Sequence, residues 1–153
     1  MDILFYHLER KPLDAVLPGL LEKTLERGQT AFIKVGSPER LKALDDHLWT
    51  YRDDMFLPHG TSEEGKPESQ PILLCLHDTN VNSASYIFIV DNAELPEQSA
   101  MEATHVERII ILFDGNDPDA LDKARSQWKT LKTTSHALTY WQQAENGRWE
   151  KRA

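Results

Sequence analysis

The sequence contains little of what several common classes of protein require. Its single cysteine, Cys75, excludes an internal disulfide framework and fits a reducing compartment. No apolar run approaches the roughly 20 residues that a membrane-spanning helix needs, so no membrane association is expected. The amino terminus has no basic segment ahead of its first apolar run, which predicts that there is no secretory signal. We therefore expect a cytoplasmic protein.

Positive charge is also scarce. The chain has 17 Lys and Arg against 25 Asp and Glu, a net charge of -8, whereas nucleic-acid binders are normally basic. No direct DNA binding is therefore expected. The charge is uneven: residues 1–120 carry 10 basic and 22 acidic side chains (net -12), and residues 121–153 carry 7 and 3 (net +4). This excess indicates either a contact with an acidic partner or a solvated basic face.

Glycines are missing where a nucleotide site would need them. Phosphates bind at strand-to-helix turns whose glycines let the backbone approach closely. The first such turn, residues 9–12, has no glycine, and the second has only Gly36. Neither the dinucleotide-binding spacing nor the P-loop spacing occurs. No cofactor is expected, and residues 87–91 are interpreted as a buried strand that ends in an acid.

Other catalytic arrangements are incomplete. Cys75, His77 and Asp78 are possible metal ligands, and Cys75 and His77 would share one face of a strand. A fourth ligand at a recognisable spacing is absent, so no metal is expected. Asp114 follows an apolar strand as the phospho-acceptor of a receiver domain does, yet Glu9 is the only acid directly after the first strand. No serine lies in a nucleophile elbow. We expect no enzyme, and the alternative is a small nucleotide-dependent enzyme or phospho-receiver-like domain of doubly wound fold.

Apolar runs alternate with amphipathic stretches, which is typical of an α/β protein. The pattern predicts strands over residues 3–8, 31–35, 72–76, 86–90, 109–113 and 138–142, and helices over 13–25, 38–49, 98–105 and 118–133. Residues 60–71 are polar, rich in Gly and Pro, and predicted to be a loop. We expect one domain over residues 1–153, with a mostly parallel sheet, helices on both faces, and Rossmann-like topology without a nucleotide-binding motif.

The helix predicted over residues 118–133 carries a candidate binding surface. Arg125 and Lys129 are four residues apart and share one stripe, with Trp128 beside them. Two cations around an aromatic ring suit a short acidic peptide that ends in an apolar residue and a free carboxylate. The alternative is that Trp128 belongs to the core and that the basic residues form a solvated face.

A second candidate surface lies at the end of the helix predicted over residues 38–49. Trp49 ends that helix, and the next loop carries Phe56, Pro58 and His59. Large apolar residues on a loop are hard to explain by burial in the domain's own core, which favours docking of another protein. The alternative is that Trp49 packs on the sheet and Phe56 lies beneath the loop.

Several motifs in order resemble one known family. They are the strand end at residues 5–8, the Asp-x-x-Leu-Trp motif at 45–49, the Phe-Leu-Pro-His motif at 56–59, the Ala-Arg-x-x-Trp-Lys motif at 124–129, and the strand at 138–141. Together they resemble the chi subunit of the bacterial DNA polymerase III holoenzyme, over nearly the whole chain. The resemblance implies a nucleotide-binding-like fold without nucleotide chemistry, which agrees with the missing phosphate loops.

The resemblance also implies partners. Chi subunits are non-catalytic members of the clamp-loader assembly at the replisome, and they grip the acidic carboxy-terminal tail of single-stranded DNA-binding protein. By position, Arg125, Trp128 and Lys129 match the tail-binding helix, with Trp128 in place of the smaller aromatic often found there.

For the second surface, the resemblance implies docking of the small partner subunit psi. Trp49, Phe56, Pro58 and His59 match that region. Some lineages with a chi subunit have no recognisable psi, so another clamp-loader protein or a helicase is the alternative partner. Residues 60–71 match no pattern of the family.

Overall fold

The computed structural model describes residues 2–51, 57–62, 66–77, 83–96 and 106–153 of the chain. These residues form one eight-stranded sheet in the order β3-β4-β2-β5-β6-β1-β7-β8. The strands are β1 Asp2–Leu8, β2 Ala31–Lys34, β3 Gly60–Thr61, β4 Ile72–Cys75, β5 Tyr86–Ile89, β6 Arg108–Asp114, β7 Ala137–Gln143 and β8 Trp149–Lys151. All neighbouring strands run parallel except β7 and β8, so the predicted α/β fold with a mostly parallel sheet is confirmed.

The three α-helices of the described residues begin where the sequence predicts. The helices are α1 Leu13–Glu26, α2 Pro38–Thr50 and α4 Pro118–Lys132. The Ser37 hydroxyl accepts a hydrogen bond from the backbone N–H of Arg40 at 3.3 Å and caps α2. The Asp117 carboxylate accepts one from the backbone N–H of Asp119 at 3.0 Å and caps α4. Each cap is followed by proline, whose fixed φ suits the first helical turn.

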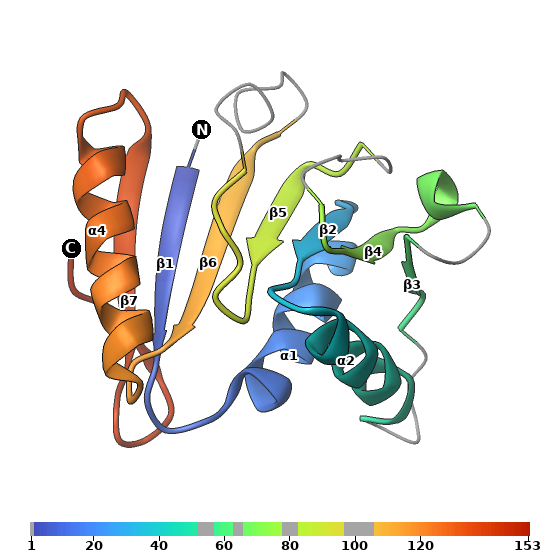
Figure 1. Cartoon of the computed structure of the whole chain (residues 1–153), viewed down its shortest axis with the longest axis horizontal. Coiled ribbons are helices and arrows are strands. Elements are labelled where there is room, and N and C mark those ends of the chain that lie inside the picture. The colour runs from blue at the N-terminus through green and yellow to red at the C-terminus, as the bar shows by residue number, and fades with distance from the viewer. Residues whose placement is uncertain (1, 52–56, 63–65, 78–82, 97–105) are drawn as a thin grey trace.

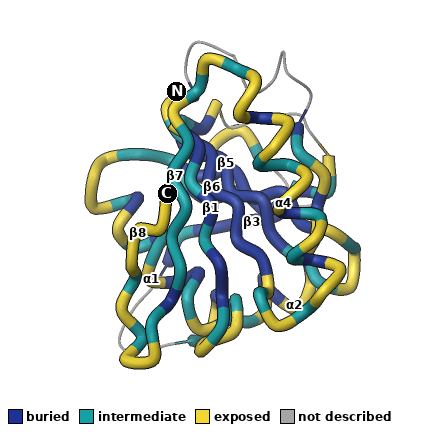
Figure 2. Tube along the Cα trace, turned by 90° about the vertical axis from the view of Figure 1, so that its left-hand side faces the viewer, coloured by how far each residue is buried: buried dark blue, intermediate teal, exposed yellow. Residues whose placement is uncertain are grey.

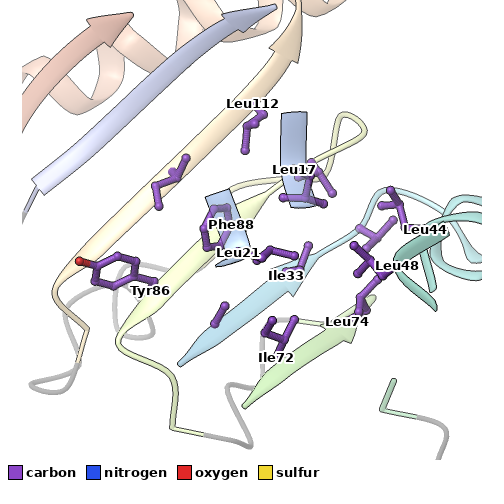
Figure 3. Packing of buried hydrophobic residues seen from close by; sticks show 14 of the residues in the cluster. Leu17, Leu21, Ile33, Leu44, Leu48, Ile72, Leu74, Tyr86, Phe88 and Leu112 are labelled. Atoms are coloured by element: carbon purple, nitrogen blue, oxygen red, sulfur yellow. The ribbon is translucent and has the colours of Figure 1, made fainter. Parts of the chain in front are cut away.

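The helices cover opposite faces of the sheet (Figure 1), as predicted. On one face, α1 and α2 bury leucines against alternate residues of β2, β4, β5 and β6, as the labelled side chains of Figure 3 show. On the other face, Ala124 and Leu131 of α4 pack with Phe5 of β1. They also pack with the residues of β2, β4, β5 and β6 that point away from α1 and α2. Central strands buried on both faces explain the nearly continuous apolar runs in the sequence.

The structure corrects part of the prediction for residues 60–71. They are not simply a loop, because Gly60–Thr61 pairs with β4 as β3, and Pro67–Ser69 forms a short 3-10 helix. A two-residue strand and a single 3-10 turn are too short to produce any periodicity in the sequence. The helix predicted over residues 98–105 lies wholly outside the described residues. No helix in the described part of the chain is both long and apolar enough to cross a membrane.

Candidate functional site

The first candidate surface lies on α4, which packs in front of β7 and β1 in Figure 1. Ala120, Ala124 and Leu131 form the buried face of the helix. Arg125 and Lys129 are exposed and Trp128 is half-buried. Within the described part of the chain, neither Arg125 nor Lys129 has an ion-pair partner. We call Arg125, Trp128 and Lys129 the α4 surface.

The Trp128 ring is fixed from below by two other rings. Its centroid lies 5.3 Å from that of Phe5 and 5.8 Å from that of Tyr140, both in edge-to-face geometry. The Lys132 ammonium lies 5.9 Å from the ring centroid, which is within the range of a cation–π contact. Trp128 therefore belongs partly to the core and partly to the surface, the two positions that the sequence analysis gave as alternatives. Preordered rings lose little entropy when a ligand binds.

Tyr140 is a residue of this site that the sequence analysis did not single out. It is half-buried, and its hydroxyl lies 2.6 Å from Nδ1 of the buried His7. Nε2 of His7 lies 3.0 Å from the Glu9 carboxylate. The period-2 alternation of β7 places Leu138 and Tyr140 on the face that α4 covers, and this alternation is the signal that could have identified them.

The charge of Arg125 acts on this polar group. Burial raises the pKa of the Tyr140 hydroxyl, while the positive charge of Arg125 lowers it. Burial also lowers the pKa of His7, with Glu9 opposing the shift and Arg125 reinforcing it. The guanidinium therefore sits close enough to β1 and β7 to act electrostatically on both side chains. A carboxylate bound beside Arg125 would therefore lie near Tyr140 and His7.

The second candidate surface is centred on Trp49. Trp49 is 47% exposed and is the one exposed large hydrophobic side chain among the described residues. It therefore does not pack on the sheet, which was the alternative interpretation. Pro58 is half-buried and adjacent in the loop, while Phe56 lies outside the described residues. We call Trp49 and Pro58 the Trp49 surface.

His59 lies beneath this surface and not on it. Its side chain is 0% exposed, and its ring centroid lies 4.3 Å from that of Trp49. Nδ1 lies 2.7 Å from the carbonyl oxygen of Leu57, and Nε2 lies 3.1 Å from the Asp45 carboxylate. His59 thus links the loop to α2 and supports the exposed indole. A direct contact of the His59 ring with a partner would require the loop to rearrange.

A cleft of about 560 Å³ opens at the carboxyl ends of β1 and β6. Ligands of open α/β sheets bind at this kind of position, so the cleft tests the nucleotide-dependent alternative. Arg40 is held there between Asp14, at 2.9 Å, and Asp91, at 3.2 Å. Burial raises the pKa of the Asp91 carboxyl, and Arg40 opposes that shift.

The cleft lining does not favour a phosphate. Its carboxylates outnumber its basic side chains. The carboxylates are those of Glu9, Asp14, Asp91, Asp114 and Asp117, and the basic side chains are Arg10, Lys11 and Arg40. Among the described residues, no glycine lines it. The Asp114 carboxylate accepts a hydrogen bond from the backbone N–H of Asn116 at 2.9 Å. Asp114 therefore stabilises the turn that the sequence predicts at this position.

Metal chemistry has no evident site in the described residues, which contain no group of three or more His, Cys, Asp or Glu side chains that could hold an ion. Cys75 is a buried free thiol, and its sulfur lies 3.4 Å from the backbone N–H of His77. The pair therefore forms a local contact at the end of β4, and further ligands do not converge on it.

These features define an α/β domain with a Rossmann-like fold, two surfaces suited to protein partners, and none of the glycine-rich turns that hold nucleotides. Residues 1–139 match the family model described as the DNA polymerase III chi subunit, HolC. The chain belongs to this family. It is also similar to a protein of Rickettsia prowazekii (strain Madrid E) named "Probable DNA polymerase III subunit chi", with 27% identity over 111 residues, 71% of this chain and 67% of that protein.

Membership of the family makes the chain an accessory subunit of DNA polymerase III, acting in DNA replication. The resemblance stated from the sequence motifs is thereby confirmed. The roles of the individual surface residues stay predictions.

Proposed function

We propose that this chi subunit is a non-catalytic adaptor that holds the acidic carboxy-terminal tail of single-stranded DNA-binding protein on its α4 surface. The observation that carries the proposal is the pairing of two exposed cations with a ring fixed by Phe5 and Tyr140. Arg125 offers a planar fork to a carboxylate, and Lys129 adds a second positive charge one turn further on. Trp128 provides apolar surface for the last side chains of the tail.

The Trp49 surface is proposed to dock the chain on the clamp-loader assembly, through psi or through another protein such as a helicase. An indole that is 47% exposed, on a support fixed by His59, is the kind of aromatic anchor that dominates protein interfaces. The surface lies on α2 and the following loop, away from α4. The two partners would therefore bind to different parts of the molecule.

The tail site can be tested with a fluorescent peptide that copies the acidic tail. Arg125→Ala and Lys129→Ala should each weaken binding by about 1.5–3 kcal/mol, because each removes a charge-assisted contact. Lys42→Ala is the matched control, since Lys42 is an exposed cation on α2. Equal binding by the wild type and both α4 variants would refute the tail site.

The absence of nucleotide chemistry can be tested separately. ATP, GTP and NAD, with and without magnesium, should leave the thermal midpoint of the domain unchanged, because the carboxylate-rich cleft repels phosphates. A concentration-dependent rise in the midpoint that Arg40→Ala abolishes would support the nucleotide-dependent alternative instead.

A further inference from the structure

The sheet has a region on the α1 face that no helix of the described chain covers. The buried core on this face lies over β2, β4, β5 and β6, where Leu17 and Leu21 of α1 pack. At β7 the strand residues become half-buried, as the change from dark blue to teal in Figure 2 shows. Trp141 of β7 belongs to neither core cluster.

Three aromatic side chains and one cationic side chain occupy this region, which we call the β7–β8 shelf. Its members are Tyr6, Trp141, Trp149 and Lys151. The Tyr6 and Trp149 rings are stacked, with centroids 4.8 Å apart and planes at 24°. The Trp141 indole N–H donates to the Thr139 hydroxyl at 3.2 Å, which holds the ring along its strand. All three rings are half-buried, so part of each is open to a ligand.

The strand register places a cation beside these rings. Lys151 is opposite Trp141, and Trp149 is opposite Gln143. Because side chains alternate across a strand, Trp141, Trp149 and Lys151 all project from the α1 face. Glu150 projects from the other face, where its carboxylate pairs with Arg152 at 2.9 Å.

Two further cations lie beside the shelf, close enough to act on Tyr6. Arg108 shares its face of β6 with Ile110 and Leu112, and its guanidinium lies 5.1 Å from the centroid of the Tyr86 ring. Arg108 and Arg27 both act on the hydroxyl of Tyr6: burial raises its pKa and the two positive charges lower it. Asp2 lies opposite Arg108 on the same face and offsets part of this charge. Lys151, Arg27 and Arg108 outnumber this one acid, on a chain of net charge -8.

We propose that the β7–β8 shelf binds single-stranded DNA, with bases stacked on the rings and phosphates against the cations. Aromatic rings among separated cations are the surface that unpaired strands use, since every base has a π-face and every phosphate a charge. A duplex keeps its bases stacked and would leave the rings unused. Net charge alone predicts no direct DNA binding, but it averages over faces of opposite sign. The proposal stands independently of the tail site, which lies on the opposite face of the sheet.

The test is fluorescence anisotropy with a labelled oligothymidylate of about 16 nucleotides at low salt. The wild-type protein should bind, and the affinity should fall as salt rises because counterions are released from the phosphates. Trp141→Ala and Lys151→Glu should each weaken binding about tenfold. Lys42→Glu makes the same change of charge on exposed α2 and should leave binding within about twofold of the wild type.

The outcomes separate this proposal from its alternatives. Absence of DNA binding at low salt would overturn the proposal. An equal loss of DNA affinity in Lys42→Glu and Lys151→Glu would also overturn it, because the affinity would then depend on net charge and not on the shelf. Arg125→Ala should weaken binding of the tail peptide while DNA binding persists. Displacement of DNA by the acidic peptide would instead assign the shelf to a protein. Lys151 is exposed, so Lys151→Glu should fold and give an interpretable DNA affinity even if Trp141→Ala fails to fold.

Discussion

At the scale of single residues, the His59 ring has an oxygen acceptor beside each of its nitrogens. Removing the ring would leave the Asp45 carboxylate and the Leu57 carbonyl without these contacts and would open space beneath Trp49. His59→Ala should therefore lower the free energy of unfolding by about 2 kcal/mol, measured by urea denaturation.

Trp49→Ala is the matched control for this prediction. Because Trp49 is 47% exposed and belongs to neither core cluster, the substitution should lower the free energy of unfolding by less than His59→Ala does. The same variant should lose capture of the clamp-loader partner. If Trp49→Ala destabilised the domain as much as His59→Ala, the indole would belong to the core and not to a docking surface.

His7 gives a prediction about pH. Burial lowers its pKa, so the unfolded chain takes up a proton more readily than the folded one below the ordinary value of about 6.5. Stability should therefore fall as the pH drops through that value, because the proton favours the unfolded state. His7→Gln should lose stability near neutral pH and show a shallower decline on acidification, in urea denaturation at a series of pH values. Parallel pH profiles for the two proteins would contradict this assignment.

At the scale of elements, the cap of α4 can be separated from its binding surface. Asp117→Ala removes the acceptor for the Asp119 N–H and should destabilise the domain by about 1 kcal/mol in urea denaturation. Asp117→Ser keeps an acceptor and should be close to the wild type. Affinity for the tail peptide should change in neither variant, because Arg125 lies two turns further along the helix. A parallel loss of affinity would show that the surface depends on the helix start.

The long elements were predictable because each satisfies a local rule. Ser37-Pro38 and Asp117-Pro118 start their helices, and central strands with both faces buried are nearly continuous in apolar residues. The strand order was not predictable in the same way, since β5 and β6 enter between β1 and β2 from later in the chain. Such pairings depend on contacts between distant residues, which no local pattern encodes.

The candidate sites divide in a similar manner. Helical spacing correctly brought Arg125 and Lys129 to one exposed side of α4. The contribution of Tyr140 depends on a strand that packs beside the helix, so it required the structure. His59 shows the opposite case, because its place in an apolar loop motif suggested a surface residue while its two acceptors hold it inside.

At the scale of the whole molecule, the two surfaces proposed to bind proteins lie toward opposite ends of the sheet. The Trp49 surface is on α2 and the loop before β3, which is one edge strand, whereas α4 packs on β1 beside β7. Sites so far apart with no shared side chains should contribute independently to binding. An adaptor requires this separation, because each partner must remain bound while the other arrives.

Simultaneous binding tests this separation directly. The affinity of the labelled tail peptide should be the same, within about twofold, in the free subunit and in the subunit saturated with its clamp-loader partner. Trp49→Ala should prevent the partner from joining the complex while peptide affinity is kept, and Arg125→Ala should do the reverse. Competition between the peptide and the partner would place both on one surface. The chain could then exchange partners but could not bridge them, so the distinction decides whether this subunit is a tether or a switch.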